Sequence, residues 1–179
     1  MHSVELLTTF INERTGLNRN TDGSLQPQAG LIDEAESVLQ DHMRQIIKAN
    51  KENLKQVKDI LLALKETTAE HHQEMLKYYM YIVDKIATTG GTDVIKEMIS
   101  ALDRTLFGIE EKSTRTEETL KRRRNVLQSF QQKQRDFLQA EKKQNQMDTG
   151  SPHDHHNSLP ESRVTFRSQT DWTHAHSEL

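Results

Sequence analysis

The sequence contains no cysteine, only three prolines and one tryptophan, and aromatic residues fill 5% of its 179 positions. The missing cysteines exclude disulfide bonds and zinc sites built on thiolates. Hydrophobic residues make up 33% of the chain and charged residues 28%, which is too little large apolar surface for a thick globular core. These shortages favour a thin, elongated helical architecture.

Membrane-spanning and secretory segments are lacking as well. No run of about twenty apolar residues could cross a bilayer. Residues 1–16 have neither the basic start nor the continuous apolar stretch of a secretory signal. We therefore expect a soluble, intracellular protein in the cytoplasm. The nucleus is a second possibility, because Lys121-Arg122-Arg123-Arg124 resembles a basic import patch.

Two long heptad patterns dominate the chain, one from Met43 to Ile82 and one from Ile95 to Phe137. Apolar residues spaced alternately three and four apart form a narrow stripe along a helix, and such a stripe leaves water only by meeting another one. Between the two patterns, Gly90 can end a helix in the left-handed conformation, and Thr92 or Asp93 can cap the next helix. The chain is therefore expected to reverse here.

The sequence predicts an all-α fold: a long antiparallel helical hairpin, or coiled coil, with a short N-terminal helix and a disordered C-terminal tail. Its two helices run roughly from Leu31 to Thr88 and from Thr92 to Gln144, each on the order of 80 Å long. A register in which the numbers of contacting residues sum to about 184 places polar residues opposite polar ones. The expected polar layers are Asn50 with Gln134, Thr68 with Thr116, and His71 with Ser113.

Three zones follow from this interpretation: residues 1–30 as a short amphipathic helix plus linker, 31–147 as the hairpin, and 148–179 as the tail. The first helix is expected from Ser3 to Arg14, with Val4, Leu7 and Ile11 on one side. Residues 16–30 are rich in Asn, Asp, Gly and Gln, which is typical of a linker. The tail is too polar to bury enough apolar surface to order itself.

No group of residues suggests catalysis, and we expect a protein that is not an enzyme and has no cofactor, metal site or small-molecule substrate. His71-His72 lacks the glutamate and the spacing of a metalloprotease motif. The tail histidines have no rigid scaffold to hold a metal in a defined geometry. They are His153, His155, His156, His174 and His176.

The run from Tyr78 to Val83 is apolar or aromatic around the whole helix, which a single seam does not require. An exposed apolar stripe marks a surface that another helix covers. Three different partners could cover this stripe: the N-terminal helix folding back, a second copy completing a bundle, or a different protein. The residues predicted to make this contact near the hairpin tip are Leu76, Tyr79, Met80, Val83 and Phe107.

The function expected from this pattern is that of a non-catalytic coiled-coil adaptor or assembly protein. It would bind a protein partner, or itself as a dimer or higher bundle, through the apolar patch near the hairpin tip. A rod of this kind exposes much surface and gains little from burial, so association with a partner stabilises it.

An alternative function rests on the charge of the second helix, where residues 90–147 hold twelve Lys and Arg against nine Asp and Glu. Cations at outward heptad positions could bind the phosphates of nucleic acid or an anionic membrane surface. A solvated helix face is the plainer interpretation. The overall charge of −3 and the absence of interleaved aromatic residues favour the adaptor. The candidate anion-binding residues are Arg115, Lys121, Arg122, Arg135 and Lys142.

Overall fold

The computed structural model describes residues 3–108 and 113–148. Within them the chain is mostly helical, and its only β-type pairing is one isolated bridge between Arg19 and Leu25. The all-α prediction is confirmed. The predicted tail lies outside the described residues, apart from its first residue at the end of the last helix. The helices are α1 (Val4–Thr15), α2 (Asp33–Asp41), α3 (Met43–Ile47), α4 (Lys51–Ala63), α5 (Gln73–Thr89), α6 (Val94–Phe107) and α7 (Thr114–Asp148), with short 3-10 turns at Leu64–Glu66 and Glu70–His72.

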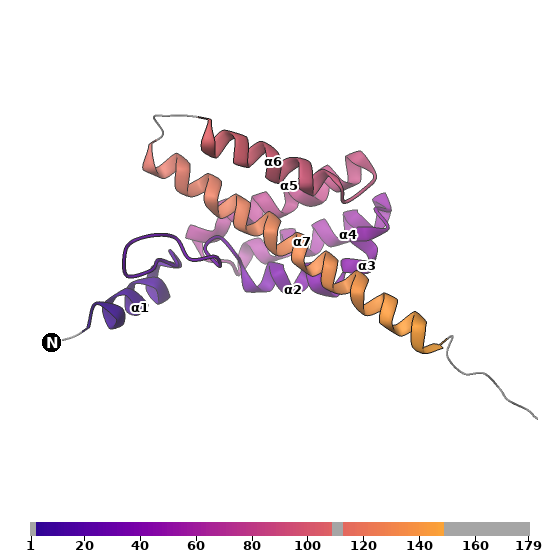
Figure 1. The fold of residues 1–179 in the computed structure, drawn as a ribbon, viewed down its shortest axis with the longest axis horizontal. Helices are drawn as coiled ribbons and strands as arrows, with labels where there is room; N and C mark the ends of the chain where they lie inside the picture. Colours follow the sequence, from indigo (N-terminus) through magenta and orange to yellow (C-terminus); the bar gives the residue numbers. More distant parts are fainter. Residues whose placement is uncertain (1–2, 109–112, 149–179) are drawn as a thin grey trace, which may run out of the picture.

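Two antiparallel helix pairs build the body of the molecule, α4 with α5 and α6 with α7 (Figure 1). Across the first pair, Lys58 Nζ lies 2.7 and 2.9 Å from the two carboxylate oxygens of Asp84. Across the second, Arg124 Nε donates to Asp103 at 2.5 Å. Because α5 also packs against α6 and α7, it joins the two pairs into one bundle.

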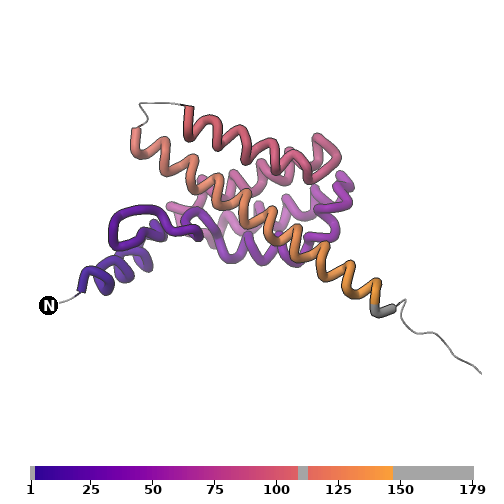
Figure 2. Tube along the Cα trace, viewed as in Figure 1, coloured from indigo at the N-terminus to yellow at the C-terminus, as the bar shows by residue number. Residues whose placement is uncertain are grey.

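The long helix α7 runs parallel to α2 and α3. Ser129 on α7 donates to Glu36 on α2, and about three turns later Glu141 pairs with Arg44 on α3 at 2.9 Å. Residue numbers therefore increase in the same direction along α7 and along α2 and α3. The tube in Figure 2 shows α7 crossing the bundle and continuing past it at its C-terminal end.

One long hairpin centred on Gly90 is not confirmed, because residues 33–89 form four helices rather than one. The predicted register also differs from the one observed. Gln134, the expected partner of Asn50, instead donates to Thr92 Oγ1 at 2.7 Å. Thr116 hydrogen-bonds to its neighbour Ser113 at 2.8 Å, rather than meeting a residue of the first seam.

Polar side chains in this region mark helix boundaries instead of forming the predicted paired layers. Asn50 is the N-cap of α4 and its side chain accepts a backbone N–H at 3.0 Å, while Ala49 before it has a φ of +49°. Gln73 Nε2 donates to the carbonyls of Lys65 and Thr68 in the turn between α4 and α5. Side chains of this kind bond to nearby backbone groups and so favour helix ends over helix interiors.

Two local predictions are confirmed. A helix forms near the N-terminus, where Ser3 Oγ caps α1 by accepting the Leu6 N–H at 3.3 Å. Gly90 ends α5 with a φ of +74°, and its N–H donates to the Ile86 carbonyl at 2.9 Å. Glycine adopts this left-handed conformation without strain, so the position of Gly90 determines where the chain reverses between α5 and α6.

The core lies where α2, α4 and α7 surround α5. It is built from aliphatic side chains spaced three and four apart on each helix, so each helix turns one face inward. The largest fully buried side chains are Tyr79, Phe130, Leu39, Met43, Ile46, Leu54, Leu61, Leu76, Ile82, Ile86, Ile95 and Leu127.

Candidate partner-binding surfaces

Four of the five residues predicted to form the partner-binding patch lie on α5, and the structure places three of them in the core. Leu76, Tyr79 and Val83 are each exposed by 1% or less, and Met80 is partly buried. This burial corrects the prediction of an open stripe. Since α5 contacts α4, α6 and α7, it needs a broad apolar face. The side that stays exposed carries Glu74, Lys77, Tyr81 and Asp84. Other helices of the same chain cover the apolar stripe of α5. One predicted cover, α1, does not take part, and it buries no residue of its own.

Phe107, the fifth predicted residue, ends α6 and is 86% exposed. A single exposed aromatic ring is common on protein surfaces. Phe107 alone therefore does not define a binding site.

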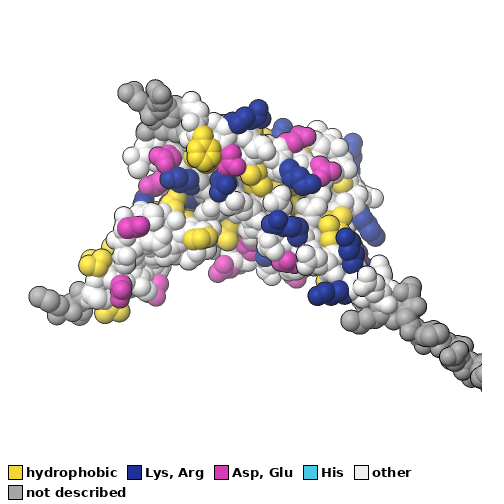
Figure 3. Space-filling model, in the orientation of Figure 1, with side chains coloured by type: hydrophobic (Ala, Val, Ile, Leu, Met, Phe, Trp, Pro, Cys, Tyr) yellow, Lys and Arg dark blue, Asp and Glu magenta, His cyan; other side chains and the backbone are white. Residues whose placement is uncertain are grey.

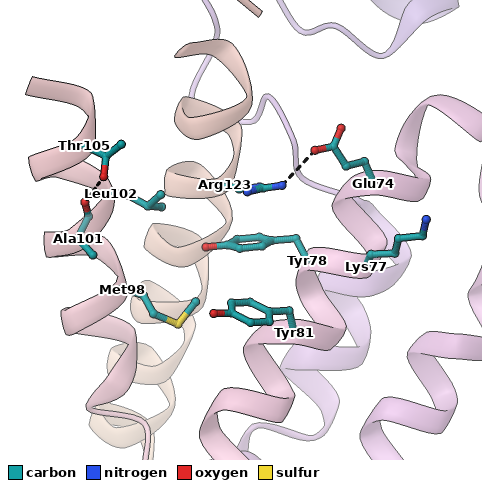
Figure 4. Close-up of a pocket in the computed structure, with 9 residues that line it drawn as sticks. All are labelled: Glu74, Lys77, Tyr78, Tyr81, Met98, Ala101, Leu102, Thr105 and Arg123. Atoms are coloured by element: carbon teal, nitrogen blue, oxygen red, sulfur yellow. Dashed lines mark hydrogen bonds and ion pairs between the residues drawn. The ribbon is translucent and has the colours of Figure 1, made fainter. Parts of the chain in front are cut away.

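A groove of about 500 Å³ opens between α5, α6 and α7. Tyr78 and Tyr81 extend from α5 toward Met98 and Leu102 on α6, as Figure 4 shows. Large side chains from two helices thus line an open apolar space. Small and charged side chains complete the lining: Ala101, Thr105, Glu74, Lys77 and Arg123.

The groove combines an apolar wall with fixed charges. Arg123 Nη2 donates to Glu74 Oε1 at 3.1 Å, and its guanidinium carbon lies 5.3 Å from the centre of the Tyr78 ring, within the range of a cation–π contact. Burial raises the pKa of Tyr78 to about 12, although the nearby Arg123 opposes this shift. The Tyr78 hydroxyl is protonated at neutral pH and can act as a hydrogen-bond donor.

The second candidate surface is the apolar side of α1. Its residues fall on one side of the helix because they are spaced three and four apart. Figure 3 shows hydrophobic side chains at the surface of the arm that α1 forms. The exposed fractions are 65% for Val4, 62% for Leu6, 57% for Leu7, 55% for Phe10 and 41% for Ile11.

The polar side of α1 faces its own chain. Asn12 Nδ2 donates to the Arg19 carbonyl, and Asn12 Oδ1 accepts the Arg19 N–H, both at 2.8 Å. At the end of the helix, Gly16 has a φ of +62°, and a Cβ there would lie 2.6 Å from His71 Nε2. With its polar side held in this way, α1 turns its apolar side to solvent.

The segment after α1 is a folded loop fastened to α7, not the loose linker that its composition predicts. Arg19 pairs with Glu118 at 2.6 Å, and Asn125 donates to two loop carbonyls at 3.0 and 3.3 Å. Gly30, with a φ of +93°, approaches α7 so closely that a Cβ would lie 2.7 Å from the Cβ of Arg122. This loop fixes the position of α1 beside the bundle.

Comparison with other proteins assigns nothing to this chain. No family model, curated protein or solved structure matches it. The two surfaces therefore have to be interpreted from their own geometry, an apolar groove on the bundle and an apolar helix face beside it.

Glu36 forms a buried polar cluster that the sequence analysis missed. It is 8% exposed, its carboxylate accepts hydrogen bonds from the hydroxyls of Tyr79 and Ser129, and Lys133 Nζ lies 3.4 Å away. Burial and the adjacent Glu36 both raise the pKa of Tyr79, so its hydroxyl remains a donor. Both carboxylate oxygens are engaged, so the cluster ties α2, α5 and α7 together. The sequence did contain a signal for this cluster. Glu36 follows Ile32 by one helical turn, so it lies on the same inward side of α2 as that apolar residue.

The predicted anion-binding residues do not form one stripe. Lys121 and Arg135 are exposed, but each bonds to a residue of its own helix, at 2.6 and 2.9 Å respectively. Arg122 is half-buried beneath the N-terminal loop, while Arg115 and Lys142 are exposed and stand about 40 Å apart along α7. In Figure 3, basic and acidic side chains alternate over this face.

Residues 3–108 and 113–148 contain no group of three or more His, Asp or Glu side chains placed to hold a metal ion. No helix among them is apolar and long enough to cross a bilayer. The tail histidines, from His153 onward, lie outside the described residues.

Proposed function

We propose that this chain is a non-catalytic helical adaptor or assembly protein that binds a protein helix in the groove between α5, α6 and α7. The observation that carries the proposal is the apolar wall of the groove, in which Tyr81 is 46% exposed, Met98 is partly buried and Tyr78 is buried. Tyrosine is enriched among the residues that dominate binding energy at protein interfaces.

The dimensions of the groove suit an amphipathic helix. Its lining spans eight residues on α5, from Glu74 to Tyr81, and eight on α6, from Met98 to Thr105. Each span is about 10 Å, or two helical turns. A partner helix with apolar residues at positions i, i+3 or i+4, and i+7 would fill this length.

The charged rim supports specificity rather than bulk affinity. Lys77 favours an acidic group on the partner, whereas Arg123 and Glu74 already pair with each other at 3.1 Å. The protonated hydroxyl of Tyr78 adds one hydrogen-bond donor at the apolar wall. A partner that places a basic group beside Lys77 would meet a like charge at the interface, which costs binding free energy.

The electrostatic alternative, a binder of nucleic acid or anionic membrane through α7, has weaker support. Of its five residues, Lys121 is held by Glu117 at 2.6 Å and Arg122 is half-buried. Affinity for phosphates depends on several cations acting on one continuous surface. A gel-shift assay and a liposome assay at low salt test this alternative, and binding that weakens with added salt and with Arg115→Ala would favour it.

Affinity capture with matched variants tests the adaptor. The tagged chain, a Tyr81→Ala variant and an Ile60→Ala control are used as baits in an extract of the native host, with quantitative mass spectrometry. Ile60 is 37% exposed on α4, so its truncation removes a comparable surface side chain outside the groove. We expect Tyr81→Ala to lower the recovery of a defined protein by about tenfold or more.

A capture profile that is the same for all three baits would contradict the proposal, provided that circular dichroism shows equal helicity. If the capture profile changes instead with Arg115→Ala or Lys142→Ala, the result would favour the electrostatic alternative over binding in the groove.

A further inference from the structure

The groove between α5, α6 and α7 and the outward face of α1 are both exposed apolar surfaces. We propose that they bind each other between molecules, so that α1 of one copy lies in the groove of a second copy. The inference rests on the proposed function of the groove and names its occupant.

The contacts that anchor α1 hold its apolar face away from its own bundle. Asn12 makes two hydrogen bonds of 2.8 Å to Arg19, and Arg19 pairs with Glu118 on α7 at 2.6 Å. An inward rotation of α1 would break these contacts and expose the polar atoms that they satisfy. The apolar face is therefore presented to another molecule.

The lengths of the two surfaces agree. From Val4 to Ile11 the apolar residues of α1 span eight positions, about 10 Å of helix. The groove lining spans the same number of positions on α5 and on α6. Leu7 falls in the middle of the helix face, where it would lie opposite the central part of the groove wall.

The charges at the end of α1 complement those at the rim of the groove. Glu13 and Arg14 follow the apolar residues of α1, and Arg14 already lies over the Phe10 ring at 5.5 Å. The rim offers Lys77 to Glu13, whereas Glu74 is already paired with Arg123 at 3.1 Å. A pairing of Glu13 with Lys77 would favour one direction of the bound helix over the other.

A lipid surface fits α1 less well. Helices that bind the membrane interface carry many Lys and Arg residues on the polar face. In α1 a single basic residue, Arg14, stands beside two acidic ones, Glu5 and Glu13. The polar side is also engaged by Asn12 with its own chain. These observations favour a second copy of the chain as the occupant.

Engineered cysteine pairs test the contact directly, because the chain has no cysteine of its own. The full chain with Leu7→Cys and Met98→Cys is oxidised mildly, and the linked peptides are identified by mass spectrometry. A second pair, Ile11→Cys with Met98→Cys, covers a shift of one helical turn. Leu7→Cys with Ile60→Cys is the control, since Ile60 lies on α4 outside the groove.

We expect a covalent dimer through positions 7 and 98, or 11 and 98, and none through positions 7 and 60. A dimer formed by Leu7→Cys alone, with no link to position 98, would overturn the proposal in favour of two α1 helices packing together. Absence of every intermolecular link would overturn it as well.

Light scattering on complementary variants tests whether both surfaces are needed. Phe10→Glu alters α1 and Tyr81→Glu alters the groove, and each is expected to raise the dimer dissociation constant by about tenfold or more. A mixture of the two variants retains one intact contact, between α1 of the groove variant and the groove of the helix variant. The mixture should therefore associate more tightly than either variant alone.

The outcomes separate this inference from the proposed function. A wild-type chain that stays monomeric while Tyr81→Ala loses a captured protein would overturn the self-contact and leave the adaptor standing. Flotation of the wild-type chain with neutral or anionic vesicles, abolished by Phe10→Glu, would overturn the second copy in favour of a lipid surface. If Tyr81 variants change neither self-association nor capture, both proposals fail.

Discussion

Glu36 shows how one residue fixes the arrangement of three helices. A buried carboxylate is costly unless hydrogen bonds compensate for its lost hydration. Here the compensation comes from Tyr79 on α5 and from Ser129 and Lys133 on α7. Any shift of α2 along α7 would separate these groups, so the cluster specifies the parallel register as well as stabilising it.

Removal of one donor should reveal this cost. Tyr79→Phe deletes the hydroxyl that donates to Glu36 and accepts the Ile32 N–H at 3.4 Å. We expect the free energy of unfolding to fall by about 1–3 kcal/mol, as is usual when a buried polar group loses its partner. Urea denaturation followed by circular dichroism measures the loss.

Tyr78→Phe is the matched control. The ring of Tyr78 is buried to a similar degree, but its hydroxyl makes no hydrogen bond to the residues that the structure describes. Its loss should therefore cost less than about 0.5 kcal/mol. Equal destabilisation by the two substitutions would show that the rings, and not the Glu36 cluster, account for the effect.

His72 couples stability to pH. Burial lowers its pKa, and the neighbouring His71 and Arg122 act in the same direction, whereas Glu34 and Asp33 oppose the shift. The folded chain thus binds a proton on His72 less readily than the unfolded chain does. The resulting stabilisation is present above the unfolded pKa of about 6.5 and is lost as pH falls through the folded pKa.

We expect the free energy of unfolding to decrease between pH 7.5 and pH 5, and His72→Gln to make that decrease smaller. Urea denaturation at several pH values measures both slopes. Identical slopes in the two proteins would rule out His72 as a source of the pH dependence.

At the scale of elements, the sequence predicts helices well and their ends less well. Gly90 ends α5 as expected, because its left-handed conformation leaves few alternatives. Asn50 and Thr68 were expected to face Gln134 and Thr116 across a seam, yet Asn50 caps α4 and Thr68 lies in the turn between α4 and α5. A seam and a helix cap would each satisfy the Asn50 side chain, and the packing of α7 against α2 and α3 decides between them. That packing is a contact distant in sequence and has no local signal.

The loop before α2 offers a test of how closely elements approach. A Cβ at Gly30 would lie 2.7 Å from the Cβ of Arg122 on α7, at a φ of +93°. Gly23 has a similar φ of +84° but nothing within 4 Å of its Cβ position. Gly23→Ala should therefore cost only the backbone strain of about 1–2 kcal/mol.

Gly30→Ala should cost about 1–3 kcal/mol more than Gly23→Ala, because overpacking adds to the same strain. Thermal and urea unfolding of both variants measure the difference. Equal costs would mean that the loop is free to move away from α7 and does not hold α1 in place.

At the scale of the whole molecule, the predicted rod is replaced by a short bundle with projecting parts. Composition correctly indicates limited apolar surface, but the heptad pattern does not show that α5 is enclosed by several helices. The tyrosines illustrate the difference. Tyr79 is buried against Glu36, whereas Tyr81, two residues later, lines the open groove. Two tyrosines of one apolar run thus differ in exposure, because the other helices cover one side of α5 and not the other.

The unequal packing of α7 should produce unequal stability along one continuous helix. Residues 126, 127 and 130 are fully buried, whereas residues 142–146 are exposed. Helices without tertiary packing are marginal in water even when their residues favour helix. Hydrogen exchange by mass spectrometry should therefore show slow exchange in the buried part, limited by global unfolding, and fast exchange by local opening from residue 142 onward. Uniformly slow exchange along α7 would contradict this gradient and would indicate that a second molecule covers the C-terminal end of the helix.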